Sequence, residues 1–336
     1  MTAAVTSAGR PSVGQLVVGP DRHGVVEYAR RVQVELEKAR PGAYPRVDAP
    51  RSRVDGLHVH FTDRLFGSGA AEAADRFCSL ATQSPTGLSV TLHDVPQESD
   101  GRHALVRADA YRRVARAARG VVVSSEHERA LMGDIPDAPV PVVIPLAVTL
   151  PSPPIPFEDS TIPDVAVLGY IYPGKGHDEV LRALASVDPS IGLLAVGTAS
   201  DGHEDLVAEL SRVAETIDRR FRTTGFVDDD ALPALLRSVA VPIAHHRHMS
   251  ASASITSWIE AGRRPLAPRT RYTGEIDARS PGTIRLFDDT PDALVAALAS
   301  ALAEPRTTWI DAAAQAHPTW AEVADAHIEV FDEWFG

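Results

Sequence analysis

Residues 164–184 read Asp-Val-Ala-Val-Leu-Gly-Tyr-Ile-Tyr-Pro-Gly-Lys-Gly-His-Asp-Glu-Val-Leu-Arg-Ala-Leu. The segment 165–168 is a short, β-branched apolar run, which is the pattern of a buried strand. Glycines at positions 169, 174 and 176 then interrupt the chain, and apolar residues recur at helical spacing from His177 onwards. The stretch therefore predicts a strand, a glycine-rich turn and a helix.

The turn is a candidate anion site, because the start of a helix presents free N–H groups and the positive end of a dipole. Lys175 adds a mobile positive charge at that point. A plain connection between a strand and a helix has the same pattern and occurs more often, so the turn alone leaves both interpretations open.

The composition is that of an ordinary globular protein with a net negative charge. The chain has 336 residues, enough for two domains, with 44% hydrophobic and 23% charged residues. Its net charge of −12 argues against general nucleic-acid binding. The single cysteine, Cys78, excludes an internal disulfide framework and is interpreted as a small buried side chain. Because 1–15 lack a signal-peptide pattern and no run approaches about 20 apolar residues, we expect a cytoplasmic protein.

The alternation of strand and helix patterns extends over both halves of the chain. In the first half we expect strands at 16–18, 56–61, 88–92, 120–125 and 139–146, and helices at 25–39, 70–80, 102–119 and through residue 131. In the second half we expect strands at 165–168, 191–196, 241–245, 265–268 and 283–287, and a strand followed by a turn at 222–227. We expect helices at 177–184, 204–213, 232–239, 252–261, 291–303 and 319–335. Repeated βα units predict an α/β fold with parallel sheets covered by helices.

A proline-rich segment separates the two halves. Residues 149–163 contain five prolines, and such a segment favours an extended linker without a core of its own. We therefore expect an N-terminal Rossmann-like domain at 1–148, a C-terminal one at 164–318, and a closing helix at 319–336 that packs back towards the first domain. Two such halves would face each other across a cleft.

Polar residues follow two strands of the first half. His93 and Asp94 come directly after the strand at 88–92, where open α/β sheets place their ligands. They could form an acid/base or hydrogen-bonding pair, or simply cap the strand. His58 and His60 alternate with apolar residues and share one face of their strand, but no third metal ligand stands nearby.

A basic helix is expected at 102–119, which carries six arginines and one aspartate. Leu105, Ala108, Val114 and Ala118 could form its apolar side. Such helices sometimes contact anionic membranes or phosphorylated acceptors, but a solvated surface is the favoured interpretation.

Short motifs run in order along nearly the whole chain. They are His23-Gly-Val-Val-Glu-Tyr28, Thr91-Leu-His-Asp94, Val122-Val-Ser-Ser125, Val143-Ile-Pro145, Leu168-Gly169 through Lys175-Gly-His177, Ala195-Val-Gly197, Thr224-Gly-Phe-Val227, Ile259-Glu-Ala-Gly262 and Trp320-Ala-Glu-Val-Ala324. Together they resemble the retaining glycosyltransferases of the family 4 type, which have the two-Rossmann GT-B architecture. Each motif is weak alone, and their joint order and spacing carries the resemblance.

The resemblance implies a role for each matching position. Gly24 would let the backbone approach the donor phosphate, His93 would contact the donor sugar near its reacting carbon, and Lys175 would hold the diphosphate. Phe226 and Val227 would meet the nucleobase, and Glu260 would bind two ribose hydroxyls. The implied catalytic set is His93 and Asp94, and the implied nucleotide-binding set is Gly24, Gly169, Tyr170, Lys175, Phe226, Val227, Ser252, Ser254, Ile255 and Glu260.

The sequence departs from the family pattern at two positions. Tyr170 stands where the family usually has an arginine, and Ser252 stands where it has a first glutamate, eight positions before Glu260. Arg247 is a candidate replacement for the lost cation. Alternatively, serines 250, 252 and 254 could supply hydroxyl and backbone donors at the helix start.

The expected function is sugar transfer, with retention of configuration, from a nucleoside-diphosphate sugar to a small molecule, glycan or glycolipid. UDP or GDP is the expected leaving nucleotide. No metal or other cofactor is expected, because no Asp-x-Asp motif stands at a strand end of the second half. Two alternatives remain: a nucleotide-sugar-binding protein with little transferase activity, or a nucleotide-sugar epimerase. We expect no nucleic-acid partner. The segment Arg102–Arg119 is a weak candidate for contact with a membrane surface.

Overall fold

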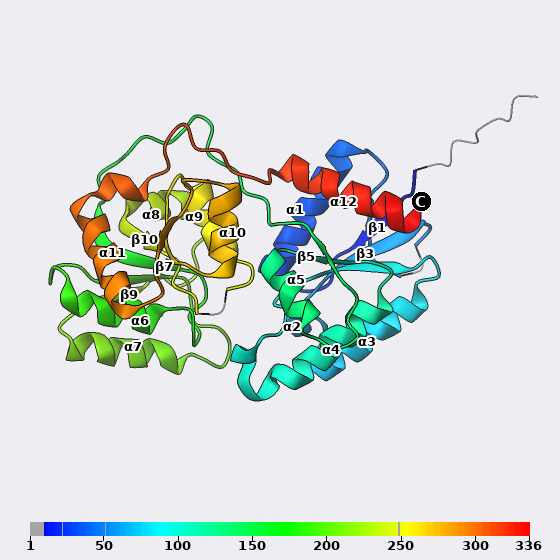
Figure 1. The fold of residues 1–336 in the computed structure, drawn as a ribbon, viewed down its shortest axis with the longest axis horizontal. Helices are drawn as coiled ribbons and strands as arrows, with labels where there is room; N and C mark the ends of the chain where they lie inside the picture. The colour runs from blue at the N-terminus through cyan, green and yellow to red at the C-terminus, as the bar shows by residue number, and fades with distance from the viewer. Residues whose placement is uncertain (1–9, 22, 51, 248) are drawn as a thin grey trace, which may run out of the picture. The chain divides into compact units, whose positions relative to one another are not determined.

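The computed structural model describes residues 10–21, 23–50, 52–247 and 249–336 (Figure 1). The chain divides into two compact units: unit 1 is Met1–Ala147 with Pro318–Gly336, and unit 2 is Val148–His317. Within the described residues, each unit has one six-stranded sheet, and all strand pairs in both sheets are parallel. The predicted α/β class with two Rossmann-like domains is confirmed.

Unit 1 has the strand order β2-β1-β3-β4-β5-β6. Its elements are β1 (Val13–Leu16), α1 (Gly24–Ala39), β2 (Arg46–Val47), β3 (Gly56–Phe61), α2 (Asp63–Phe66), α3 (Ala70–Gln83), β4 (Leu88–Leu92), η1 (Glu98–His103), α4 (Ala104–Ala117), β5 (Val121–Val123), α5 (Glu126–Gly133), β6 (Val142–Val143) and α12 (Trp320–Phe335).

Side-chain alternation along β3 separates the two layers of this unit. Leu57, Val59 and Phe61 pack on one face, in a core shared with α3 and α4. The intervening His58 and His60 lie on the opposite face, and the His58 ring lies 5.0 Å from that of Phe331 in α12. The strand therefore contributes its apolar side chains to one layer and its imidazoles to the other.

Unit 2 has the strand order β12-β11-β10-β7-β8-β9. Its elements are β7 (Ile162–Leu168), α6 (His177–Ala183), η2 (Leu184–Ser186), β8 (Leu193–Val196), α7 (Asp205–Thr216), β9 (Phe221–Thr223), α8 (Leu232–Ser238), β10 (Val239–Ile243), α9 (Ala253–Glu260), β11 (Leu266–Pro268), α10 (Arg271–Arg279), β12 (Arg285–Phe287), α11 (Pro291–Ala303) and η3 (Pro305–Thr308).

The central strand β7 is buried on both faces. Val165 and Val167 pack against α6 and α11, and Ala166 and Leu168 pack in a second core with Trp258 of α9. A strand that is buried on both faces has a continuous run of apolar residues, which explains why the sequence of 165–168 predicted a buried strand.

Several predicted elements differ in detail. The first strand is Val13–Leu16 instead of 16–18, because its pairing with β3 begins at Val13 and Gly56. The strand expected at 139–146 is reduced to Val142–Val143. The predicted apolar side of the basic helix is wrong in part: Leu105 is 86% exposed, and the buried face of α4 is Ala110, Tyr111, Val114 and Ala115.

Helix α10 was not predicted. Its mean composition is polar, with arginines at both ends, but Tyr272 and Ile276 are buried one turn apart. Thr270 caps its first turn by accepting a hydrogen bond from the backbone N–H of Thr273. Those two signals would have located it. No helix among the described residues combines the length and apolarity needed to cross a bilayer.

Candidate functional site

Lys175 lies over the carboxyl end of β7. Gly169, the residue after that strand, has φ +112°, and a Cβ added there would lie 3.0 Å from Lys175 Nζ. Glycine thus leaves room for the lysine side chain to fold back over the strand end. Lys175 is only 6% exposed, so its side chain is packed in place and is not the mobile charge that the sequence predicted.

The amine of Lys175 meets the start of helix α9. Its Nζ donates to Ser254 Oγ at 3.3 Å, and Ser254 Oγ lies 3.0 Å from Ser252 Oγ. Ser252 is the N-cap of α9 and accepts from the backbone N–H of Ile255. A lysine, two hydroxyls and a helix start therefore come together, which is a group of donors suited to an anion.

Burial lowers the pKa of Lys175 to about 7. The amine is therefore close to half protonated at neutral pH in the free protein. A bound anion would favour the protonated form, so binding of a phosphate here would be coupled to proton uptake.

Glu260 is the last residue of α9 and is half-buried. It follows Ser252 by eight positions, so about 12 Å of helical rise separates the two residues. Lys175, predicted to bind the diphosphate, thus contacts the start of α9, and Glu260, predicted to bind the ribose, is the last residue of that helix.

Exposed aromatic residues lie at the same edge of the sheet. Tyr170 and Tyr172 follow β7, and Phe226 with Val227 follows β9, two strands away. Tyr170 is 53% and Phe226 59% exposed. The Tyr172 ring centre lies 5.9 Å from the amine of Lys175. The sequence analysis did not name Tyr172 as a site residue. Its position two residues after Tyr170 on an extended segment places both side chains on the same side of the chain and could have indicated it.

Arg247, the candidate replacement for the arginine of the family pattern, already has an acidic partner. Its Nε lies 2.5 Å from Glu179 Oε1 in an ion pair, so its charge is already matched by an acid of α6. The neighbouring His246 is buried and lies 3.5 Å from Ser254 Oγ through Nε2. The sequence reasoning missed this residue, although adjacent histidines directly after β10 are an unusual ending for a buried strand.

In unit 1, His93 lies at the carboxyl end of β4. Its Nε2 is 3.0 Å from His60 Nδ1, and the two rings are stacked with centres 5.3 Å apart. Burial, with a smaller contribution from His23, lowers the pKa of His93 to about 3, so the ring is neutral.

Of the two alternatives that the sequence left open for His93 and Asp94, the structure does not show a hydrogen bond between these two side chains. Asp94 Oδ2 accepts from Thr62 Oγ1 at 3.4 Å, and the backbone at Asp94 has φ +53°. The backbone therefore adopts a left-handed conformation at Asp94, two residues after the end of β4. The ring of His93 contacts His60 on the neighbouring strand β3.

The tautomer of His58 follows from its partners. Ser89 Oγ donates to Leu57 O, so it accepts from His58 Nδ1 at 2.9 Å. His58 Nε2 then accepts from Thr91 Oγ1 at 3.0 Å. With both nitrogens in hydrogen bonds, His58 could join His60 at a metal only by losing one of them. The described residues contain no group of three or more potential metal ligands.

Gly24 is the first residue of α1, and His23 is its N-cap, accepting from the backbone N–H of Val25 through Nδ1. A Cβ added at Gly24 would meet nothing within 4 Å. The space beside this glycine is therefore open, and its backbone conformation does not require glycine.

The positive charge of α4 is largely matched by acids within unit 1. Arg107 pairs with Asp63 at 3.0 Å and with Asp100 at 2.5 Å. Arg112 pairs with Asp109, and Arg113 with Asp75. These pairs favour the interpretation of this helix as a solvated face.

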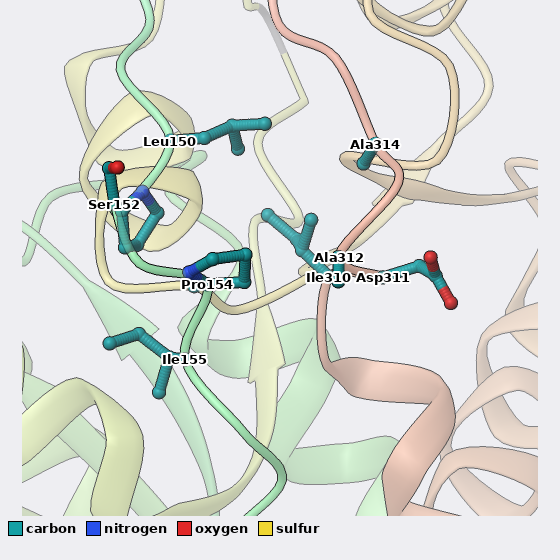
Figure 2. A pocket seen from close by; sticks show the side chains of 10 residues that line it. Leu150, Ser152, Pro154, Ile155, Ile310, Asp311, Ala312 and Ala314 are labelled. Atoms are coloured by element: carbon teal, nitrogen blue, oxygen red, sulfur yellow. The ribbon is translucent and has the colours of Figure 1, made fainter.

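A separate cavity of about 180 Å³ lies in unit 2, between the linker and residues 310–314 (Figure 2). It is mainly apolar, and none of the predicted site residues lines it. Its walls are Leu150, Pro151, Ser152, Pro154, Ile155, Gly262, Ile310, Asp311, Ala312 and Ala314.

The sequence matches no protein-family model. It also matches no curated protein sequence. Several solved structures, in contrast, match over nearly their whole length. HepE from Anabaena, in complex with UDP and glucose, has a TM-score of 0.67 at 14% identity, covering 96% of this chain and 97% of that one.

Two further structures give similar values. Sucrose-phosphate synthase from Thermosynechococcus elongatus has a TM-score of 0.65 at 16% identity, covering 96% of this chain and 94% of that one. AviGT4, a glycosyltransferase involved in avilamycin A biosynthesis, has a TM-score of 0.61 at 14% identity, covering 97% and 98%. At these identities the likeness concerns the fold, and the chain has the GT-B fold.

Proposed function

We propose that this chain is a glycosyltransferase that moves a sugar from a nucleoside-diphosphate sugar to an acceptor. The observation that carries the proposal is the buried Lys175, whose amine meets Ser254 at the start of α9. Among the residues that the structure describes, no acid forms an ion pair with this amine, and burial is the cause that lowers its pKa. Burying an unpaired amine is unfavourable, and a bound diphosphate would supply negative charge beside it.

The chemistry of transfer fits this arrangement. The leaving nucleoside diphosphate gains negative charge as the bond to the sugar breaks, and donors fixed in place beforehand stabilise that charge. Protonated Lys175 and the hydroxyls of Ser252 and Ser254 would act there. Positive charge comes from the protein in this proposal, so no metal ion is part of it.

The other roles follow the resemblance. Glu260 would bind the ribose, Phe226 and Val227 would border the nucleobase, and Gly169 and Tyr170 would line the diphosphate. His93 would contact the sugar, with retention of configuration. UDP is the first nucleotide to test, because HepE structures contain UDP or UDP-glucose.

A second candidate is a protein that binds a nucleotide sugar without transferring it. Tyr170 and Ser252 favour this alternative, because a cation and a carboxylate of the family pattern are absent together. Retained binding without turnover would distinguish it from the transferase.

The test begins with thermal-shift measurements against UDP, GDP, ADP and dTDP and their sugars, followed by calorimetry. The chain has two lysines, Lys175 and the exposed Lys38, so lysine acylation reports on the site directly. UDP should protect Lys175 from acylation and leave Lys38 reactive in the same sample.

The Lys175→Met variant should lose at least tenfold in nucleotide affinity, and the matched Lys38→Met variant should bind as the wild type does. Proton NMR of the reaction with a panel of acceptors then detects turnover and the anomeric configuration of the product. Full nucleotide affinity in Lys175→Met would overturn the proposal.

A further inference from the structure

Three buried histidines surround the Lys175 turn in unit 2. His177 is the first residue of α6, and His245 and His246 follow β10. All three are at most 7% exposed. The turn and the end of β10 are in close contact, because a Cβ on Gly176 would lie 1.9 Å from the carbonyl oxygen of His245. Glycine at 176, with φ +95°, allows this approach.

His246 and Lys175 converge on one hydroxyl. Lys175 Nζ lies 3.3 Å and His246 Nε2 lies 3.5 Å from Ser254 Oγ. Ser252 Oγ lies 3.0 Å from the same atom. Two basic side chains from separate segments therefore contact the same hydroxyl group at the start of α9.

The groups that act on His246 are basic. Besides burial, the charges that lower its pKa are those of Lys175, His177 and His245. Neither ring nitrogen of His177 has a hydrogen-bond partner among the residues described. Concentrating basic groups in a buried place is unfavourable until an anion enters.

The nearby carboxylates face His245 instead. Asp289 Oδ1 lies 4.0 Å from His245 Nε2. Burial lowers the pKa of His245, and Glu179 and Asp289 act in the opposite direction. Glu179 is already paired with Arg247. The ring of His245 also stacks on Phe287, with centres 5.8 Å apart. His245 thus packs on Phe287 and has acidic neighbours, whereas the charges that act on His246 are those of Lys175, His177 and His245.

We propose that His246 is the second cation of the diphosphate site, in place of the arginine that Tyr170 replaces. This inference rests on the proposed function. In the free protein the ring is neutral and contacts Ser254. When a nucleoside diphosphate binds beside Lys175, the imidazole takes up a proton from solvent and Nε2 donates to a phosphate oxygen.

The experiment is calorimetry of UDP binding at pH 7.5 in buffers of different ionisation enthalpy, which gives the number of protons taken up. The wild type should take up more than one proton, from Lys175 and His246 together. His246→Gln should take up nearly one proton fewer and bind roughly 10- to 100-fold more weakly, the size of a lost charge-assisted hydrogen bond. His245→Gln is the matched control and should change affinity less than about threefold.

A second measurement needs no variant to fold. In ¹⁵N-histidine-labelled wild type, saturation with UDP should convert one buried neutral imidazole to the imidazolium form. If every buried histidine stays neutral, or if folded His246→Gln keeps the affinity and proton uptake of the wild type, the role of His246 is overturned while nucleotide binding stands. Failure of the wild type to bind any nucleotide would instead remove the proposed function itself.

Discussion

At the scale of single residues, burial holds the amine of Lys175 in an unfavourable environment. Its pKa is about 7 in the folded protein and 10.5 for an ordinary lysine, with burial as the cause. Between these values the unfolded chain binds more protons than the folded chain. The stability of the wild type should therefore rise as pH increases from 7 towards 10.5.

Lys175→Met removes this dependence. We expect the variant to be more stable than the wild type by about 1–4 kcal/mol at pH 6, with a difference that shrinks above pH 7. Urea unfolding at pH 6, 7, 8 and 9 measures it, with Lys38→Met as the exposed control. A wild type that is more stable than Lys175→Met at pH 6 would show that the amine has a stabilising partner in the folded protein.

We expect His60 to orient the ring of His93, through the 3.0 Å contact between His60 Nδ1 and His93 Nε2. Burial lowers the pKa of both rings, so one neutral nitrogen donates and the other accepts. We expect His93 to occupy one tautomer in the wild type and both in His60→Phe, which keeps an aromatic ring beside Tyr28. The ¹⁵N chemical shifts of the ring distinguish these states.

His327→Phe is the control, because its ring lies 5.8 Å from that of His58 and its Nδ1 contacts the carbonyl of Val323. It should leave the tautomer of His93 unchanged. An unaltered tautomer ratio in His60→Phe would mean that another group orients His93.

At the scale of elements, Arg263 ties three segments of unit 2 together. The side chain is fully buried, and it donates to the carbonyls of Leu236, Val239 and Thr308. Its guanidinium also lies 4.7 Å from the ring centre of Trp309. The end of α8, the start of β10 and η3 thus share one cation, which satisfies carbonyl groups that a helix end leaves unpaired.

We expect Arg263→Met to destabilise unit 2 by about 3 kcal/mol or more, because several buried carbonyls lose their donors at once. Arg182→Met is the comparison, since Arg182 is 59% exposed and pairs with Asp178 on the surface of α6. It should change stability by less than about 1 kcal/mol. Urea unfolding of both variants provides the measurement, and equal effects would show that Arg263 is replaceable by packing alone.

The elements that the sequence predicted best are those whose local pattern agrees with their place in the sheet. The strands β3 and β4 and the helix α11 have the predicted bounds, because alternation, apolar runs and a Thr290 cap all point the same way. Including Leu105 made the predicted buried face of α4 wrong. The side of α4 that faces the core is set by the packing of Tyr111 and Val114. Tertiary contacts of this kind cannot be predicted from the spacing of apolar residues along the sequence.

The same limit applies to the candidate site. Lys175, Ser252 and Ser254 were named from the sequence, but the contact between Lys175 and Ser254 joins positions 79 residues apart. Sequence reasoning could place each residue at a strand or helix end. It gave no means of seeing that the amine is buried, or that His246 meets the same hydroxyl.

At the scale of the whole molecule, the chain returns to its first unit after completing the second. Helix α12 belongs to unit 1, and Arg40 holds it with two 2.8 Å hydrogen bonds to Asp332. Glycines make room for its aromatic residues: a Cβ on Gly56 or Gly120 would lie within 2.3 Å of the rings of Phe335 and Trp334. The buried residues of α12 include Val323, Ala324, His327, Ile328, Val330, Phe331 and Phe335.

A chain ending at Thr319 should therefore lose the fold of unit 1 and keep that of unit 2. Removing five large buried apolar side chains costs on the order of 10 kcal/mol, which is comparable with the stability of an entire domain. The tryptophans allow the two units to be followed separately, because Trp320 and Trp334 lie in α12 and Trp258 and Trp309 lie in unit 2.

In the truncated chain, tryptophan fluorescence should thus report unit 2 alone and show a cooperative urea transition like that of the full chain. Circular dichroism should show lost helix at zero urea, and proteolysis should cleave within 10–147. The point variant Gly120→Val, which places side-chain atoms where Trp334 lies, should weaken unit 1 in the same direction with a smaller loss. If the truncated chain instead kept a protease-resistant unit 1, the layer formed by α1 would be sufficient without α12, and the closing helix would serve another purpose.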